Sequence, residues 1–228
     1  MEEHLLNYAR SFLGYGKLCA PVWIIGLEEA GDSSEEAMLQ RLKHWKNRGS
    51  RQLEDGPEFK RLVAPSRYNR LEEPLIQQTL GKLIRFVFSA VHEATAVDRE
   101  QIRQYQVSKW GSFEGDIASL ELSALPAKNT KPSEWRYGDY LSHPDLQSRR
   151  NYRRFIERER VPRIVEALRD HKPTFVLCYG KVALTHWDRI RTECSQLTTK
   201  FEVIAHPTRL KNADLEYLGI TYRSMLME

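Results

Sequence analysis

The chain has 228 residues, of which 41% are hydrophobic and 29% charged, and its formal net charge is +4. This length suits one domain with a full core, and the mild basic bias is compatible with nucleic acid without indicating it. Cys19, Cys178 and Cys194 exclude a disulfide framework, have no zinc spacing and are too few for an iron–sulfur cluster. No apolar run approaches the roughly 20 residues of a membrane span, and the acidic start lacks a signal-peptide pattern. We therefore expect a soluble cytoplasmic protein.

The first half of the chain alternates between helical and strand patterns. We predict a helix over residues 3–13, a strand over 17–26, a helix over 32–45, a loop insertion over about 47–70 and a helix over 75–91. The continuous apolar run from Val22 to Ile25 is typical of a strand that is buried on both faces of a sheet.

The second half continues this alternation. We predict strands over 116–122, 174–179 and 200–205, a loop insertion over about 125–146, and helices over 145–160, 163–170, 181–191 and 212–227. Strands separated by helices form parallel sheets with right-handed crossovers. We therefore predict one α/β domain over residues 1–228, a three-layer α/β/α sandwich around a four-stranded parallel sheet.

Polar groups follow the first and last of these strands. Glu28 and Glu29 come directly after the run that ends at Gly26, and His206-Pro207 follows the last strand. Ligands of open α/β sheets bind at the carboxyl ends of the strands, where a His can act as acid, base or donor. Taken alone, His206 is better explained as a loop residue that is hydrogen-bonded to the backbone than as a catalytic group. Taken alone, Glu28 and Glu29 are better explained as solvated acids of a loop.

Four stretches in this order change that balance: Gly26-Leu-Glu-Glu-Ala-Gly31, the strand-like run 117–126, Gly180-Lys-Val-Ala183 and His206-Pro-Thr-Arg-Leu210. Together they resemble the uracil-DNA glycosylase superfamily, whose first motif reads GQDPYH, GLAPG or GEAPG and whose last motif reads HPSPLS. The resemblance implies a monofunctional DNA glycosylase that flips a nucleotide and hydrolyses the N-glycosidic bond of a damaged or modified base. The product is an abasic site, and the reaction needs no metal or cofactor.

The resemblance also implies the catalytic roles. Breaking the N-glycosidic bond makes the sugar positive and the departing base negative, so a carboxylate and a donor are needed on opposite sides of that bond. Glu28 stands third in its motif, where the family has its carboxylate, and Glu29 is the alternative. His206 matches the family's His and is expected to donate to the leaving base. No lysine is well placed for a Schiff-base step, since Lys181 and Lys211 read as surface charges.

The expected base pocket departs from the uracil-specific branch. We assign to it Gly26, Leu27, Ser123 and Tyr68. Ser123 takes the place of the family's Asn, and Ser lacks the fixed donor and acceptor pair that reads the uracil edge. Glu29-Ala30 replaces the family's Pro-Tyr. Both changes indicate a roomier pocket, so a bulky phage-type modified pyrimidine becomes a candidate substrate.

Two segments are expected to contact single- or double-stranded DNA. The first contains Leu210, which matches the family's wedge residue, with Thr208, Arg209 and Lys211 beside it. The second is the arginine-rich helix, on which Arg149 and Arg153 share one face that can meet phosphates. A solvated helix paired with Glu157 and Glu159 explains the same pattern equally well.

We expect a monomer, and two other functions remain open for it. A non-catalytic domain that binds nucleic acid or a partner on the same scaffold would explain the departures from the motifs. Hydrolysis of a free nucleotide or nucleoside would instead require a small-molecule substrate and no salt-dependent affinity for DNA.

Overall fold

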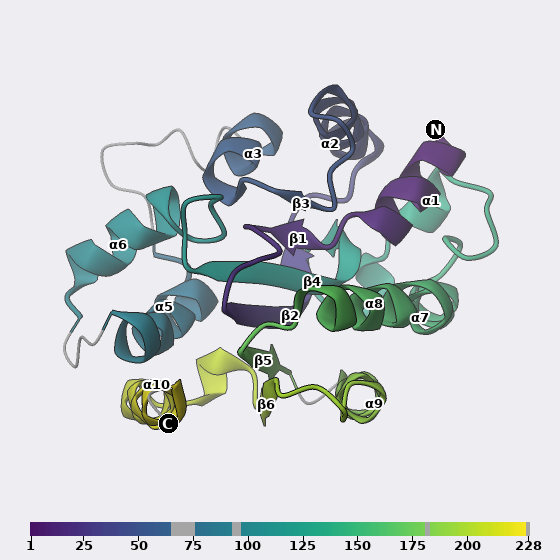
Figure 1. Ribbon diagram of the computed structural model, residues 1–228. Helices are drawn as coiled ribbons and strands as arrows, with labels where there is room; N and C mark the ends of the chain where they lie inside the picture. Colours follow the sequence, from purple (N-terminus) through teal and green to yellow (C-terminus); the bar gives the residue numbers. More distant parts are fainter. Residues whose placement is uncertain (65–75, 93–96, 181–182, 227–228) are drawn as a thin grey trace.

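The structure is a computed structural model that describes residues 1–64, 76–92, 97–180 and 183–226. They form an α/β fold around one six-stranded, mostly parallel sheet (Figure 1). The strands are β1 (Gly14–Tyr15), β2 (Val22–Ala30), β3 (Leu53–Glu54), β4 (Ile117–Ala127), β5 (Phe175–Tyr179) and β6 (Lys200–Ile204). Their order across the sheet is β3-β1-β4-β2-β5-β6.

The predicted parallel strands are confirmed as the neighbours β4, β2, β5 and β6, but the prediction of only four strands is wrong. The short strands β1 and β3 extend the sheet beyond β4, and β1 runs antiparallel to β4. Gly14 permits this contact, because a Cβ there would collide with the backbone carbonyl of Ser119. Strands of two residues show no periodicity in the sequence, so they could not be predicted from it.

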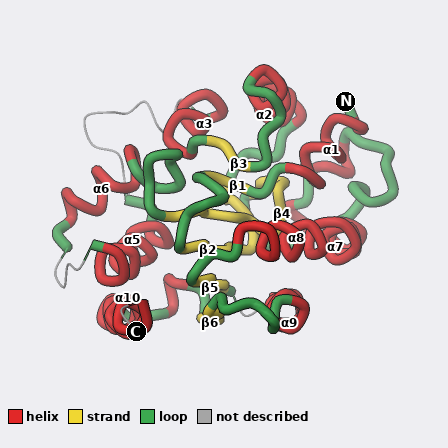
Figure 2. The backbone as a smooth tube through the Cα atoms, in the orientation of Figure 1, coloured by secondary structure: helices red, strands yellow, loops and turns green. Residues whose placement is uncertain are grey.

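Helices cover both faces of the sheet (Figure 2). They are α1 (Glu2–Ser11), α2 (Glu35–Asn47), α3 (Gly56–Val63), α5 (Gln78–Val91), α6 (Arg99–Ser108), α7 (Arg149–Phe155), α8 (Val161–His171), α9 (Leu184–Glu193) and α10 (Asn212–Leu226). Along β2, Trp23 and Ile25 pack with residues of α1, α2, α7, α8 and α9. Val22 and Ile24 pack on the other face with residues of α5, α6 and α10.

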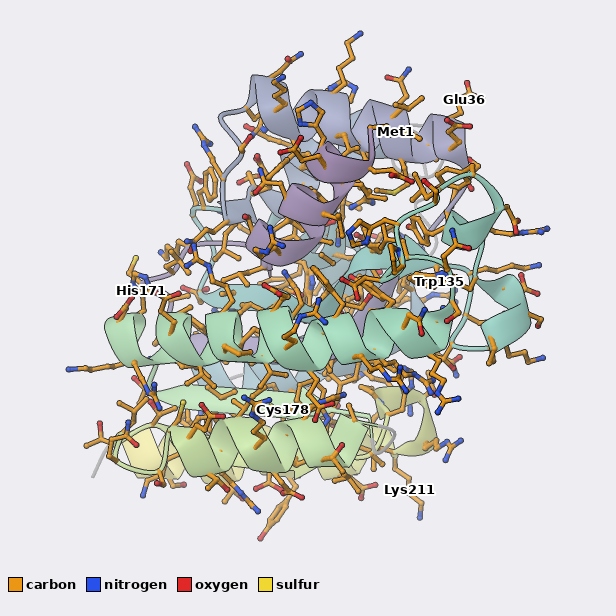
Figure 3. The ribbon with its side chains drawn as sticks, turned by 90° about the vertical axis from the view of Figure 1, so that its right-hand side faces the viewer. Met1, Glu36, Trp135, His171, Cys178 and Lys211 are labelled. Atoms are coloured by element: carbon orange, nitrogen blue, oxygen red, sulfur yellow. The ribbon has the colours of Figure 1, made fainter. Side chains whose placement is uncertain are left out.

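A π-helical turn over Ile156–Arg160 joins α7 to α8, so the arginine-rich helix continues as one rod up to His171 (Figure 3). At its start, Trp135 stacks on Tyr152 with ring centroids 4.9 Å apart. The rod therefore packs the irregular segment that follows β4 against the sheet.

The two predicted loop insertions have different structures. The described part of 47–70 contains β3 and helix α3, so the loop prediction is wrong there. Asp55 caps α3 by accepting the N–H of Glu58, and Pro57 lies in its first turn. The insertion over 125–146 is irregular as predicted, apart from two short 3₁₀ turns and the end of β4, which extends to Ala127. No described helix is both long enough and apolar enough to span a bilayer.

Candidate active site

A cavity of about 570 Å³ opens where the parallel strands end. Its lining includes Glu28 and Glu29 of β2, Glu121 of β4, Tyr179 of β5, His206 after β6 and Lys60 of α3. This is the carboxyl edge at which open α/β sheets bind ligands. The strand order explains why Glu28 and Glu29 lie near His206, because β5 alone separates β2, which carries both glutamates, from β6, which leads to His206.

Glu28 lies in a buried ion pair. Its Oε2 is 2.6 Å from Nη1 of Arg149, and each side chain is only 7% exposed. Its other oxygen, Oε1, is buried without a hydrogen-bond partner among the described residues. Burial raises the pKa of Glu28, while the charge and hydrogen bond of Arg149 lower it in part. One carboxylate oxygen is thus fixed, and the other has unused capacity to accept a hydrogen bond.

Glu29 is held by a different set of side chains. Its Oε2 accepts hydrogen bonds from Tyr15 Oη at 2.6 Å and Arg41 Nη1 at 3.1 Å. Burial alone would raise the pKa of Glu29, but the charges of Arg41 and Lys60 and these hydrogen bonds lower it. The pairing of β2 with β4 shifts register between Glu28 and Ala30, and this irregularity lets consecutive glutamates line one cavity.

Glu121 is a site residue that sequence reasoning missed. It lies opposite Gly26 in the β2–β4 pairing, and its Oε2 is buried with no hydrogen-bond partner among the described residues. Burial and the charge of Glu29 raise its pKa to about 8. The available signal was an acid between Leu120 and Leu122, in the middle of an apolar strand.

Gly26, which we assigned to the base pocket, does not itself line the cavity but lies against two residues that do, Glu121 and Tyr179. A Cβ at Gly26 would lie 2.6 Å from Glu121 Oε2 and closer still to Tyr179 Oη. Only glycine leaves room there for both side chains. Leu27, also assigned to the pocket, lines the cavity.

His206 is half-buried at the start of a 3₁₀ turn over Pro207–Arg209. Its Nδ1 accepts the backbone N–H of Thr208 at 3.4 Å and is 2.8 Å from the hydroxyl of the same residue. Because an N–H can only donate, the neutral ring carries its proton on Nε2. Burial and the nearby charge of Arg209 lower the pKa of His206, so the ring is neutral at pH 7. Tyr179 packs edge-on against the imidazole at 5.7 Å.

Two predicted site residues lie elsewhere. Ser123 is buried, donates its hydroxyl hydrogen to the carbonyl of Leu125 and does not line the cavity. The prediction that Arg149 is an exposed DNA contact is wrong, because this side chain is buried. Its guanidinium is surrounded by Glu28, the carbonyl of Asn129 and the face of Trp135. A helical pattern alone cannot distinguish an exposed arginine from one that turns inward to a partner.

The other predicted DNA contacts differ in exposure. Arg153, Arg209 and Lys211 are exposed, and Thr208 and Arg209 line the cavity. Leu210 is partly buried against the apolar cluster of α5 and α10, and its carbonyl accepts a hydrogen bond from Lys82. Tyr68 lies outside the described residues.

Lys60 is a second cavity residue that the sequence did not reveal. Its side chain is buried, and Nζ lies 4.5 Å from the centre of the Tyr15 ring. Lys60 therefore lines the cavity although it falls in a stretch that was predicted as a loop. Within the described residues, no group of three or more His, Cys, Asp and Glu is arranged to hold a metal ion.

Comparisons with known protein families, with curated proteins and with solved structures found no match to this chain.

Proposed function

We propose that this protein is a monofunctional DNA glycosylase, which hydrolyses the N-glycosidic bond of a damaged or modified base. The observation that carries the proposal is the placement of Glu28 and His206 on one cavity, from strands that β5 separates. A carboxylate and a neutral donor are the two groups that this reaction requires. The resemblance of both motifs to the uracil-DNA glycosylase superfamily, with its three-layer α/β/α fold, supports the same conclusion.

Glu28 serves the sugar side of the bond in this proposal. Arg149 fixes Oε2, and Oε1 accepts a hydrogen from the attacking water and stabilises the cation that develops on the sugar. Glu29 is the weaker choice, since Tyr15 and Arg41 already bind it and hold its pKa low. Its charge then strengthens the negative potential around the sugar.

His206 serves the leaving base. The neutral ring donates Nε2–H to a base oxygen on which negative charge develops as the bond breaks. A preorganised donor of this kind is worth about 10²–10³-fold in rate.

The DNA backbone meets exposed cations around the cavity. Lys128 and Arg209 line its mouth, and Arg150, Arg153 and Arg154 are exposed on α7. If these residues bind phosphates, the affinity for DNA falls steeply as the salt concentration rises.

The test is to incubate the protein with uracil-containing, oxidised, deaminated and hypermodified phage DNAs, and to identify any released base by mass. Release of one base that is abolished in Glu28→Gln and in His206→Ala supports the proposal. Glu58→Gln, an exposed glutamate on α3, is the control that leaves release unchanged. Salt-sensitive binding of DNA without any release would instead identify a nucleic-acid-binding domain.

A further inference from the structure

The three glutamates of the cavity have only two arginine partners among the described residues. Glu28 pairs with Arg149 and Glu29 with Arg41, whereas Glu121 has no ion pair and its Oε2 no hydrogen bond in that part of the chain. An isolated carboxylate is costly to bury, and such a group takes up a proton instead of keeping its charge.

The charged groups that face Glu121 lie on β2, on α3 and on the π-helical turn. Glu28 and Glu29 on β2 oppose its ionisation, and Lys60 on α3 favours it. Tyr179 on β5 adds a phenol that approaches Oε2 across Gly26. Arg160, from the π-helical turn, donates to the backbone carbonyl of Glu121 at 2.6 Å. Two carboxylates and burial outweigh one ammonium and Arg160, so Glu121 is neutral at pH 7.

We propose that Glu121 is a general acid of this site, which donates its proton to a ring nitrogen of the departing base. This inference rests on the proposed glycosylase function. In the proposed reaction, Glu28 acts on the water and the sugar, His206 donates to a base oxygen, and Glu121 protonates a ring nitrogen.

The step balances without a further reactant. The bond between C1′ and the base nitrogen breaks, and its electron pair goes to the base while the Glu121 proton moves to the ring nitrogen. Water adds its oxygen to C1′ and gives a proton to Glu28. The base leaves as a neutral molecule, and the proton that Glu28 took from water passes through solvent to Glu121, which restores both groups.

The proton also selects a class of base. The carboxyl O–H donates to a ring nitrogen that has a free lone pair, and the carboxyl C=O accepts from an adjacent amino group. Aminopyrimidines of the cytosine type present this pair of atoms. A lactam base of the uracil type presents an N–H at the same ring position, which opposes the O–H donor. The preferred substrate is therefore a cytosine-type base.

The test uses matched oligonucleotides that carry 5-hydroxymethylcytosine or 5-hydroxymethyluracil, so that only the base edge differs. We expect faster release of the cytosine-type base, and a loss of about 10²-fold or more in Glu121→Gln, which keeps the hydrogen-bonding atoms but has no acidic proton. Wild-type release should fall about tenfold per pH unit above the pKa of Glu121, about 8, and the variant should show no such fall.

An infrared measurement tests the neutral acid without any turnover. A protonated-carboxyl band should be present at pH 7 in the wild type and in Glu54→Gln, a buried acid outside the cavity, and absent in Glu121→Gln. Absence of the band in the wild type overturns the inference. Equal release of both bases, preference for the uracil type, or release of neither also overturns it. Release that does not depend on Glu121 overturns the inference but leaves the glycosylase proposal standing.

Discussion

The two sides of the cavity are built differently. The acidic wall is formed by Glu28, Glu29 and Glu121, and side chains from distant parts of the chain hold the first two. Arg41 alone contacts Tyr8, Tyr15 and Glu29. The loop of His206 is held by the Nδ1 contacts with Thr208 and the 3₁₀ turn that follows, by Tyr179 against the ring, and by Lys82, which donates to the carbonyl of Leu210.

This difference indicates where stability and function are coupled. The acidic wall is part of the core, so a change there alters folding as well as chemistry. The His206 loop is half-buried at the end of β6, so a change there mainly affects the reaction. In the proposed reaction, preorganised charge is thus concentrated on the sugar side, and the proposed donor to the base lies on the side that can adjust to different bases.

The largest expected effect comes from the wall. Glu28→Gln keeps an acceptor for Arg149 but removes the negative charge that, in the proposed reaction, faces the sugar. We expect base release to fall by about 10²–10⁴-fold, measured in single-turnover reactions. The free energy of unfolding should fall as well, because Arg149 keeps a buried charge without its ion-pair partner. Normal release by this variant would transfer the role to Glu29, for which Glu29→Gln is the matched test.

Removing a buried arginine tests the structural role of the wall. Arg41→Ala leaves Glu29 buried without its ion pair, so we expect a loss of about 3–5 kcal/mol in the free energy of unfolding. Arg158→Ala, which breaks exposed pairs with Asp145 and Glu159, should cost less than about 1 kcal/mol. Urea titration of both variants compares them, and equal losses would contradict the distinction between wall and surface.

The protonation of Glu121 makes stability depend on pH. Its pKa rises from 4.5 to about 8 on folding, so the folded state binds the extra proton between these values. That stabilisation is complete below pH 4.5 and is lost as the pH rises through about 8. Compared with Glu121→Gln, the wild type should therefore weaken by a few kcal/mol between pH 5 and pH 9, as measured by urea unfolding. A difference between the two proteins that stays constant with pH would show that Glu121 is ionised.

The smallest effect is expected on the loop side. Thr208→Val removes the hydroxyl beside Nδ1 of His206 but leaves the backbone N–H contact. We expect a loss of up to about tenfold in base release, and about 1 kcal/mol or less in stability. A stability loss as large as that of Arg41→Ala would show that the loop is as integral to the core as the wall.

The sequence predicted those parts of the site that depend on local patterns. Glu28 and His206 were assigned because each follows a run with strand composition and stands in a motif that resembles the glycosylase superfamily, and both line the cavity. We assigned Ser123 to the base pocket, but the residue of this strand that faces the cavity is Glu121, two residues earlier. The predicted strand ended at residue 122, whereas β4 continues to Ala127, so its end did not mark the cavity.

The remaining site residues depend on tertiary contacts. Arg149 belongs to a helix that reads as evenly basic, and only the packing of Trp135 and Glu28 turns it inward. Lys60 enters the cavity because α3 forms within a polar stretch that was predicted to be a loop. Neither position carries a periodicity that reveals its partner.

The most direct test of the account is to count free base and abasic sites in one reaction of the wild-type protein with the DNA panel. The account predicts equal amounts of the two products, an unbroken strand, no protein–DNA adduct after borohydride reduction, and release by Glu28→Gln that is slower by about 10²–10⁴-fold. A covalent adduct that is lost in Lys60→Ala would contradict the monofunctional mechanism. Base release that persists without both Glu28 and His206 would contradict the assignment of the site.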